Sequence, residues 1–264
     1  MLTRRRRNAL AENYGGNIAY SRYGSGEELL VILHGWGCNK EMFAPIAEEL
    51  ARKYTVIVPD LPGFGESPEP ERPFSVGDYT SMMIDFIKSL GFKSVSLMGH
   101  SYGGRIIIKM FSMGSLPFKI KRVCLVDAAG IKPKKSVGQK LSLLCYKGGR
   151  KILSLPPLKK LFPNAIENWR KKRGSADFNN ASEIMKKTLV LSVNEDLTNC
   201  LKNIDCPTLL FWGDKDDATP LSDAKIMEKK IPDAGLVVLD GGSHYSFLEN
   251  TPFFLRVANS FFEN

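Results

Sequence analysis

Short runs of Val, Ile and Leu alternate along the sequence with amphipathic stretches that are long enough to form helices. This alternation predicts βα units whose strands pair in a mostly parallel sheet. Residues 17–23 alternate between apolar and polar and precede Gly24-Ser25-Gly26, which indicates an antiparallel start with a tight turn. The expected core strands are residues 29–33, 55–58, 94–98, 122–126, 208–212 and 235–239, and the expected helices are residues 42–52, 76–90, 102–112, 222–230 and 253–262.

The alternation stops after Val126 and resumes only at Thr208. Four prolines divide the interval into short pieces whose apolar residues recur at roughly helical spacing. We therefore expect a helical cap at residues 131–206, inserted into a core domain made of residues 1–130 and 207–264. A pocket is expected between the cap and the core. The candidates to line it are Trp36, Tyr102, Leu144 and Trp169.

The positive charge of the chain is concentrated in the expected cap. The formal net charge is +9, and residues 131–206 hold 16 Lys or Arg and 6 Asp or Glu, so the other residues sum to −1. The sequence contains no recognisable nucleic-acid-binding motif, so we expect no nucleic-acid partner despite this charge. A solvated, lysine-rich surface explains the charge, and attraction of anionic substrates or of an anionic surface is the alternative.

Several other classes of protein are excluded. Hydrophobic residues make up 43% of the 264 residues, too many for a disordered chain, and 23 glycines are too few for collagen. The sequence has no run of about 18 apolar residues that could span a bilayer. Four arginines at residues 4–7 are not followed by the apolar stretch of a signal peptide, so we expect a cytoplasmic protein. Without Cys-x-x-Cys pairs or phosphate-binding glycine loops, we expect neither a metal nor a nucleotide cofactor.

One motif carries a candidate nucleophile. Gly99-His100-Ser101-Tyr102-Gly103-Gly104 follows one expected strand and opens one expected helix. Glycines on either side of Ser101 allow a sharp turn that raises its hydroxyl above the edge of the sheet, an arrangement known as the nucleophile elbow. The start of the helix favours a negative charge that develops there.

A serine hydroxyl needs a base to take its proton, and the chain has three histidines. His34 follows the first core strand, and His100 adjoins Ser101 on the turn with its ring directed away from the hydroxyl. His244 lies on the loop after the last strand, at the same edge of the sheet as Ser101. Elimination therefore selects His244 as the base.

The base in turn needs a carboxylate to orient it. The loop after the strand at residues 208–212 offers three, Asp214, Asp216 and Asp217, and the residues alone do not distinguish them. Asp127, directly after the strand at residues 122–126, is an outside candidate whose other interpretation is a helix or loop cap.

Ester chemistry also requires hydrogen-bond donors for the oxyanion. The turn His34-Gly35-Trp36-Gly37 can present the backbone amide of Trp36 to a carbonyl oxygen held beside Ser101. The amide of Tyr102, at the start of the helix, is the second expected donor.

Together these motifs resemble the α/β-hydrolase family. The blocks that agree in order are His34-Gly35-Trp36-Gly37, Asp60-Leu61-Pro62-Gly63-Phe64-Gly65-Glu66-Ser67, the serine elbow, and the loops that carry Asp216 and His244. The resemblance implies a mostly parallel sheet of about eight strands flanked by helices, with a helical cap inserted after strand 6. In this family the acid usually falls three residues after the strand-end glycine and four before a proline, which favours Asp216. The loop at residues 60–67 is then structural.

Within that family the chain is similar to pimeloyl-ester carboxylesterases and to meta-cleavage product hydrolases. We expect a carboxylesterase that cleaves small, possibly anionic, esters through an acyl-enzyme on Ser101, with His244 and Asp216 completing the catalytic triad. One alternative is a hydrolase for carbon-carbon, thioester, lactone or amide bonds that uses the same residues. Another is a non-catalytic ligand-binding protein on a hydrolase scaffold.

Overall fold

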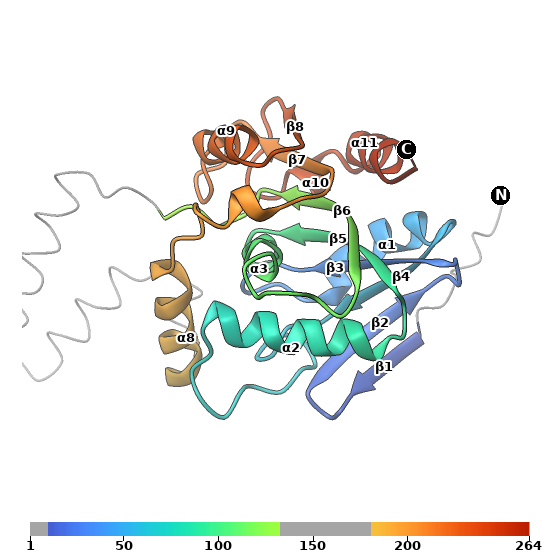
Figure 1. Ribbon diagram of the computed structural model, residues 1–264, viewed down its shortest axis with the longest axis vertical. Coiled ribbons are helices and arrows are strands. Elements are labelled where there is room, and N and C mark those ends of the chain that lie inside the picture. Colours follow the sequence, from blue (N-terminus) through green and yellow to red (C-terminus); the bar gives the residue numbers. More distant parts are fainter. Residues whose placement is uncertain (1–9, 133–180, 264) are drawn as a thin grey trace, which may run out of the picture.

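The computed structural model describes residues 10–132 and 181–263 and contains one eight-stranded sheet (Figure 1). The strands run in the order β1-β2-β4-β3-β5-β6-β7-β8. β1 and β2 are antiparallel to their neighbours, and the other pairs are parallel. The bounds are β1 Leu10–Tyr14, β2 Ile18–Tyr23, β3 Glu28–Leu33, β4 Tyr54–Pro59, β5 Ser94–His100, β6 Lys119–Val126, β7 Thr208–Gly213 and β8 Ala234–Leu239. This topology confirms the expected α/β-hydrolase fold.

Helices cover both faces of the sheet. They are η1 Lys40–Phe43, α1 Ala44–Leu50, α2 Val76–Ser89, α3 Tyr102–Met110, α8 Glu183–Asn194, η2 Leu201–Asn203, α9 Leu221–Lys230, α10 Ser246–Glu249 and α11 Thr251–Glu263. Alternate residues of β3 point to opposite faces, so Val31 belongs to the core cluster that includes residues of α2, α3 and α9, and Ile32 to the cluster that includes residues of α1, α10 and α11. The sheet is thus buried on both sides, which explains the nearly continuous apolar runs of its central strands.

The predicted elements match the structure with three differences. β1 was not predicted, and neither was the four-residue helix α10. The start of the sheet is antiparallel as expected, but Gly24-Ser25-Gly26 leads into β3, which does not pair with β2. The tight turn instead joins β1 to β2, where the amide of Asn17 donates to the carbonyl of Tyr14.

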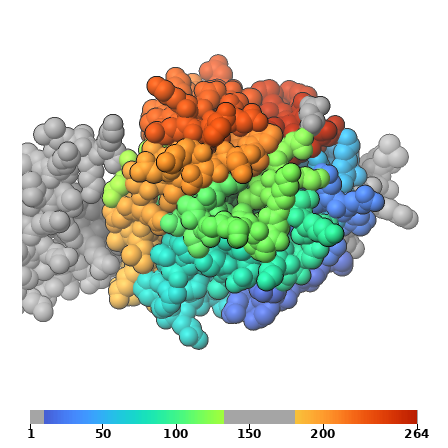
Figure 2. Space-filling view, in the orientation of Figure 1, coloured from blue at the N-terminus to red at the C-terminus, as the bar shows by residue number. Residues whose placement is uncertain are grey.

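Most of the predicted cap, with its candidates Leu144 and Trp169, lies outside the described residues, so the domain boundaries remain predictions. Within the described part, α8 packs on the core through polar side chains. The amide of Phe74 donates to Thr188 Oγ1 at 3.0 Å, and Ser192 Oγ lies 2.9 Å from the hydroxyl of Tyr102. Figure 2 shows α8 in orange, lying directly against green and cyan parts of the core. Among the helices described, none has the length and apolar character needed to cross a membrane.

Candidate active site

Ser101 lies at a sharp turn between β5 and α3, as the elbow motif predicts. Its backbone has a φ of 49°, a left-handed conformation that is rare for residues other than glycine. The turn requires small neighbours, because a Cβ on Gly103 would lie 2.0 Å from the carbonyl oxygen of Leu33. The nucleophile candidate is therefore held at the C-terminal edge of the sheet, at the start of α3.

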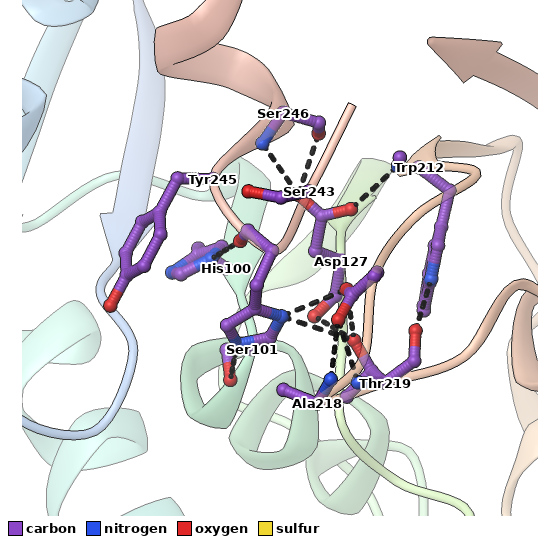
Figure 3. Close-up of polar contacts among 12 residues, drawn as sticks. His100, Ser101, Asp127, Trp212, Ala218, Thr219, Ser243, Tyr245 and Ser246 are labelled. Carbon is purple, nitrogen blue, oxygen red and sulfur yellow. Dashed lines mark hydrogen bonds and ion pairs between the residues drawn. The ribbon is translucent and has the colours of Figure 1, made fainter. Parts of the chain in front are cut away.

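The structure brings the three predicted residues Ser101, His244 and Asp216 together. His244 Nε2 lies 2.9 Å from Ser101 Oγ, and His244 Nδ1 lies 2.8 Å from Asp216 Oδ2. A carboxylate only accepts hydrogen bonds, so Nδ1 carries the proton in the neutral ring and Nε2 is left to accept from the serine hydroxyl. This is the tautomer that a general base beside a serine requires. Figure 3 shows the loops that meet here, with Ser101 opposite the loop of Ala218 and Thr219.

The fold distinguishes the three acids of the β7 loop. Asp217 is exposed, and Asp214 accepts from the amide of Gly241 at 2.7 Å and pairs with Lys215. Asp216 is buried, and it is the one whose carboxylate reaches His244. Burial raises the pKa of Asp216, but hydrogen bonds from His244 and Thr219 outweigh this effect and hold the pKa below its ordinary value. Asp216 is therefore kept as a carboxylate ion.

The other two histidines are buried and bound elsewhere. His34 Nε2 accepts from the amide of Leu61 at 2.9 Å, so its Nδ1 carries the proton and donates to the carbonyl of Gly35. His100 Nε2 donates to the carbonyl of His244 at 2.8 Å. Burial lowers the pKa of His34 to about 4 and that of His100 to about 3. Both rings are therefore neutral near pH 7, and the ring that shares a hydrogen bond with Ser101 Oγ is that of His244.

The predicted oxyanion turn lies against the elbow. A Cβ on Gly35 would lie 3.2 Å from Ser101 Cβ, so the next amide along this turn, that of Trp36, is close to the serine. Tyr102 is the first residue of α3, and its amide has no acceptor within the helix. The rings of Trp36 and Tyr102 pack edge to face with centroids 5.4 Å apart. The turn that carries one predicted donor thus lies against Ser101, and the other predicted donor is the amide of the next residue along the chain.

The loop at residues 60–67 has a structural role, as the resemblance implied. Asp60 is fully buried and accepts from the backbone amide of Lys40 at 2.6 Å, from Lys40 Nζ at 2.8 Å and from the amide of Glu66 at 2.9 Å. Lys40 Nζ also lies 2.7 Å from Glu66 Oε2. These bonds fasten the loop to the segment that follows the predicted oxyanion turn.

Comparison with known proteins identifies the family. The family described as "Alpha/beta hydrolase family" matches residues 30–256. The chain belongs to this family. It is therefore an enzyme of the hydrolase class.

Relatives of this α/β-hydrolase include esterases and a lipase by name. It is 30% identical to "Lipase 1" of Psychrobacter immobilis over 89% of this chain and 77% of the relative. It is 29% identical to the pimeloyl-[acyl-carrier protein] methyl ester esterase of Legionella pneumophila strain Corby, over 93% of this chain and 99% of the relative. The crystal structure of a bromoperoxidase from Bacillus anthracis superposes with a TM-score of 0.74 at 21% identity, covering 97% of this chain and 100% of that one.

A cavity of about 340 Å³ adjoins the predicted oxyanion turn of this α/β-hydrolase. Its lining includes the predicted pocket residue Trp36, together with Phe64, Met185 and Glu69. A larger groove of about 610 Å³ contains Arg122, on the first half of β6, and Arg256, so it lies away from the serine edge. Within residues 10–132 and 181–263, no cluster of three His, Cys, Asp or Glu side chains is arranged to hold a metal ion.

Sequence reasoning missed two contributors to the site. Thr219 donates from Oγ1 to Asp216 Oδ2 at 2.7 Å and from its amide to Asp216 Oδ1 at 2.9 Å, so it fixes the acid from two sides. A carboxylate that bonds the backbone two or three residues on is typical of an Asx turn, and this pattern could have been sought in the sequence. Met185, on α8, carries no such signal, because its place in the cavity depends on how the chain returns to the core.

Proposed function

We propose that the enzyme is a serine esterase that cleaves small carboxylic esters through an acyl-enzyme intermediate. One observation carries the proposal: hydrogen bonds of 2.9 Å and 2.8 Å link Ser101 Oγ to His244 and His244 to Asp216 without a break. The relatives named as esterases and a lipase support ester bonds as the target. The substrate class is then a small-molecule ester.

In the acylation half-reaction, Ser101 Oγ forms a bond to the ester carbonyl carbon while its proton passes to His244 Nε2. Asp216 stabilises the imidazolium that results and keeps its ring oriented. The carbonyl oxygen becomes an oxyanion, which the amides of Trp36 and Tyr102 stabilise. The bond to the alcohol oxygen then breaks, and the alcohol leaves with the proton from Nε2.

Deacylation repeats these steps with water. His244 takes a proton from the water as its oxygen attacks the acyl carbon of the ester on Ser101. Collapse of the second tetrahedral intermediate breaks the bond to Ser101 Oγ, which recovers its proton from His244. The carboxylic acid is released, and the neutral ring is restored.

We further propose the domain division expected from the sequence, with a core of residues 1–130 and 207–264 and a helical cap at residues 131–206. The described end of this segment supports it, because α8 contributes Met185 to the cavity beside Trp36. A substrate held there would lie against the aromatic rings of Trp36 and Phe64. The cavity presents polar and apolar surface in similar amounts: Trp36, Phe64 and Met185 offer apolar surface for part of an acyl chain, and Glu69 and Ser182 lie beside them.

The replacement Ser101→Ala tests this proposal. It should abolish hydrolysis of p-nitrophenyl butyrate and labelling by a fluorophosphonate, while circular dichroism stays unchanged. Ser112→Ala is the matched control, since Ser112 is exposed just beyond the end of α3 and should keep wild-type activity. Turnover that survives Ser101→Ala would refute the assignment. If Ser101 is labelled but no ester in a panel is turned over, the result would instead favour another type of bond, such as the carbon-carbon bond of a vinylogous diketone.

A further inference from the structure

Asp127 is a buried acid that the proposed chemistry does not use. It directly follows β6, and its side chain is fully buried. Its φ is 44°, and in the described part of the chain only Ser101 shares a positive φ outside glycine. Such conformations cost free energy and persist where the surroundings enforce them, most often at functional sites. The contacts around Asp127 must therefore enforce this backbone conformation.

The carboxylate of Asp127 joins the loop of the acid to the loop of the base (Figure 3). Oδ1 accepts from the amide of Gly213 at 2.9 Å, and Gly213 lies three residues before Asp216. Oδ2 accepts from the amide of Ser246 at 3.1 Å and from its hydroxyl at 2.6 Å, and Ser246 lies two residues after His244. One side chain thus spans the two loops whose spacing sets the contact between His244 and Asp216.

The backbone around Asp127 holds the third partner. The amide of Ser101 donates to the carbonyl of Val126 at 3.0 Å, and the amide of Ala129 donates to the carbonyl of Ser101 at 2.9 Å. The strained nucleophile is therefore bound on both sides by the turn that Asp127 shapes. Thr219 Oγ1 lies 3.0 Å from the carbonyl oxygen of Asp127, which adds a second contact to the acid loop.

We propose that Asp127, as a carboxylate ion, is a positioning residue that sets the relative places of Ser101, Asp216 and His244. This inference rests on the proposed function, because a positioning role has meaning only if those three residues react. Asp127 touches none of the reacting atoms itself. It acts through Gly213, Ser246 and the elbow.

The ionised form suits these contacts. The backbone amides of Gly213 and Ser246 can only donate, so a proton on the carboxylate that points at either amide would displace it and loosen its loop. Burial raises the pKa of Asp127 to about 6; the charge of Asp216 adds to this effect, while Ser246, Gly213 and His244 oppose it. Asp216 and His244 are the charged or titratable groups that face it. We therefore expect Asp127 to gain a proton, and the site to lose alignment, as pH falls through about 6.

The raised pKa of Asp127 also means that its positioning role can be distinguished from a contribution to the stability of the fold. Between pH 3.8 and about 6 the folded protein holds a proton on Asp127 that the unfolded chain releases, so this group lowers stability as pH rises through that window. Above it, the ionised carboxylate is unfavourable for folding relative to a neutral group. Removing its charge should harm alignment without an equal loss of stability.

The test compares Asp127→Asn with wild type and with Ser246→Ala. We expect Asp127→Asn to lower kcat at pH 8 by about tenfold or more with KM little changed, and to slow fluorophosphonate labelling of Ser101 by a similar factor. Its Tm at pH 8 should fall no further than that of the control Val123→Ala, so the loss of kcat exceeds what the loss of stability explains. Wild-type activity should fall as pH drops through about 6, and the variant should lack the part of this fall that comes from protonation of Asp127, so its pH profile should be the flatter of the two. Ser246→Ala removes one of the three donors and should give a smaller loss of kcat.

Val123→Ala is the control, because it opens a space in the core of β6 away from the serine edge. It should lower Tm and keep kcat. Wild-type kcat and pH dependence in Asp127→Asn would overturn the proposal, as would a loss of kcat that merely follows Tm. If Asp127→Asn fails to fold, wild-type kcat in Ser246→Ala would overturn it, as would a loss of kcat that only follows Tm, and a reduced kcat with a Tm no lower than that of Val123→Ala would support it. Ser101 that resists labelling in wild type would defeat the proposed function, whereas equal labelling in wild type and Asp127→Asn defeats only this inference.

Discussion

At the scale of single residues, burial decides what the sequence leaves open. Three acids follow β7 within four positions, and no local pattern separates them without the resemblance to a family. The fold turns Asp216 inward to His244 and leaves Asp217 in solvent. Identical chemical groups thus acquire different roles because of their surroundings.

This difference predicts the effects of two identical substitutions. Asp216→Asn should lower kcat by about 10⁴-fold, because an amide stabilises neither the imidazolium nor the required tautomer. Asp217→Asn removes the same charge one residue away and should leave kcat unchanged. Hydrolysis of p-nitrophenyl butyrate by the two purified variants measures both effects. Comparable activity in both would mean that Asp216 is not the orienting acid.

At the scale of elements, ion pairs differ with their burial. The side chain of Lys40 is 4% exposed and that of Asp60 is fully buried, and their pair fastens η1 to the loop after β4. Lys53 and Glu263 also pair, at 2.7 Å, but their side chains are 60% and 40% exposed. A buried pair that loses one partner leaves an uncompensated charge, whereas an exposed charge is solvated by water.

We therefore expect Lys40→Met to lower the free energy of unfolding by about 3–5 kcal/mol. Lys53→Met, the matched control, should lower it by no more than about 1 kcal/mol. Urea unfolding at pH 7, followed by tryptophan fluorescence, gives both values. Equal losses in the two variants would show that the buried pair holds the loop no more firmly than the exposed pair holds α11.

Sequence patterns predicted elements well where burial is continuous. The central strands appear in the sequence as apolar runs because helices cover both faces of the sheet. The start of α2 is marked by Ser75 and Asp78, which form a capping box. The sequence patterns did not predict β1, because this strand lies at the edge of the sheet, where Leu10 is 62% exposed, and has no apolar run. The helix α10 has four residues, which are too few to show a helical spacing of apolar residues in the sequence. The contacts of Asp127 with Gly213 and Ser246 link positions 86 and 119 residues apart, beyond any local pattern.

At the scale of the whole molecule, charge is divided unevenly. Residues 131–206 carry a net charge of +10 and the rest of the chain −1. Long-range attraction by such a segment would raise the rate at which anionic esters arrive. Glu69 lines the cavity beside Trp36 and opposes an anion that comes close. The attraction acts over a longer range than the repulsion, so a change in salt concentration affects the two differently.

Salt screens charges beyond about 10 Å at 0.1 M, so it weakens long-range attraction more than contact repulsion. If the basic segment recruits substrate, kcat/KM for an ester with a carboxylate-ended acyl chain should fall several-fold, at most about tenfold, between 20 mM and 500 mM NaCl. A neutral ester of equal length is the control and should show little change. A flat profile for both esters would assign the charge of residues 131–206 to solubility. A rise for the anionic ester would mean that repulsion by Glu69 dominates its binding.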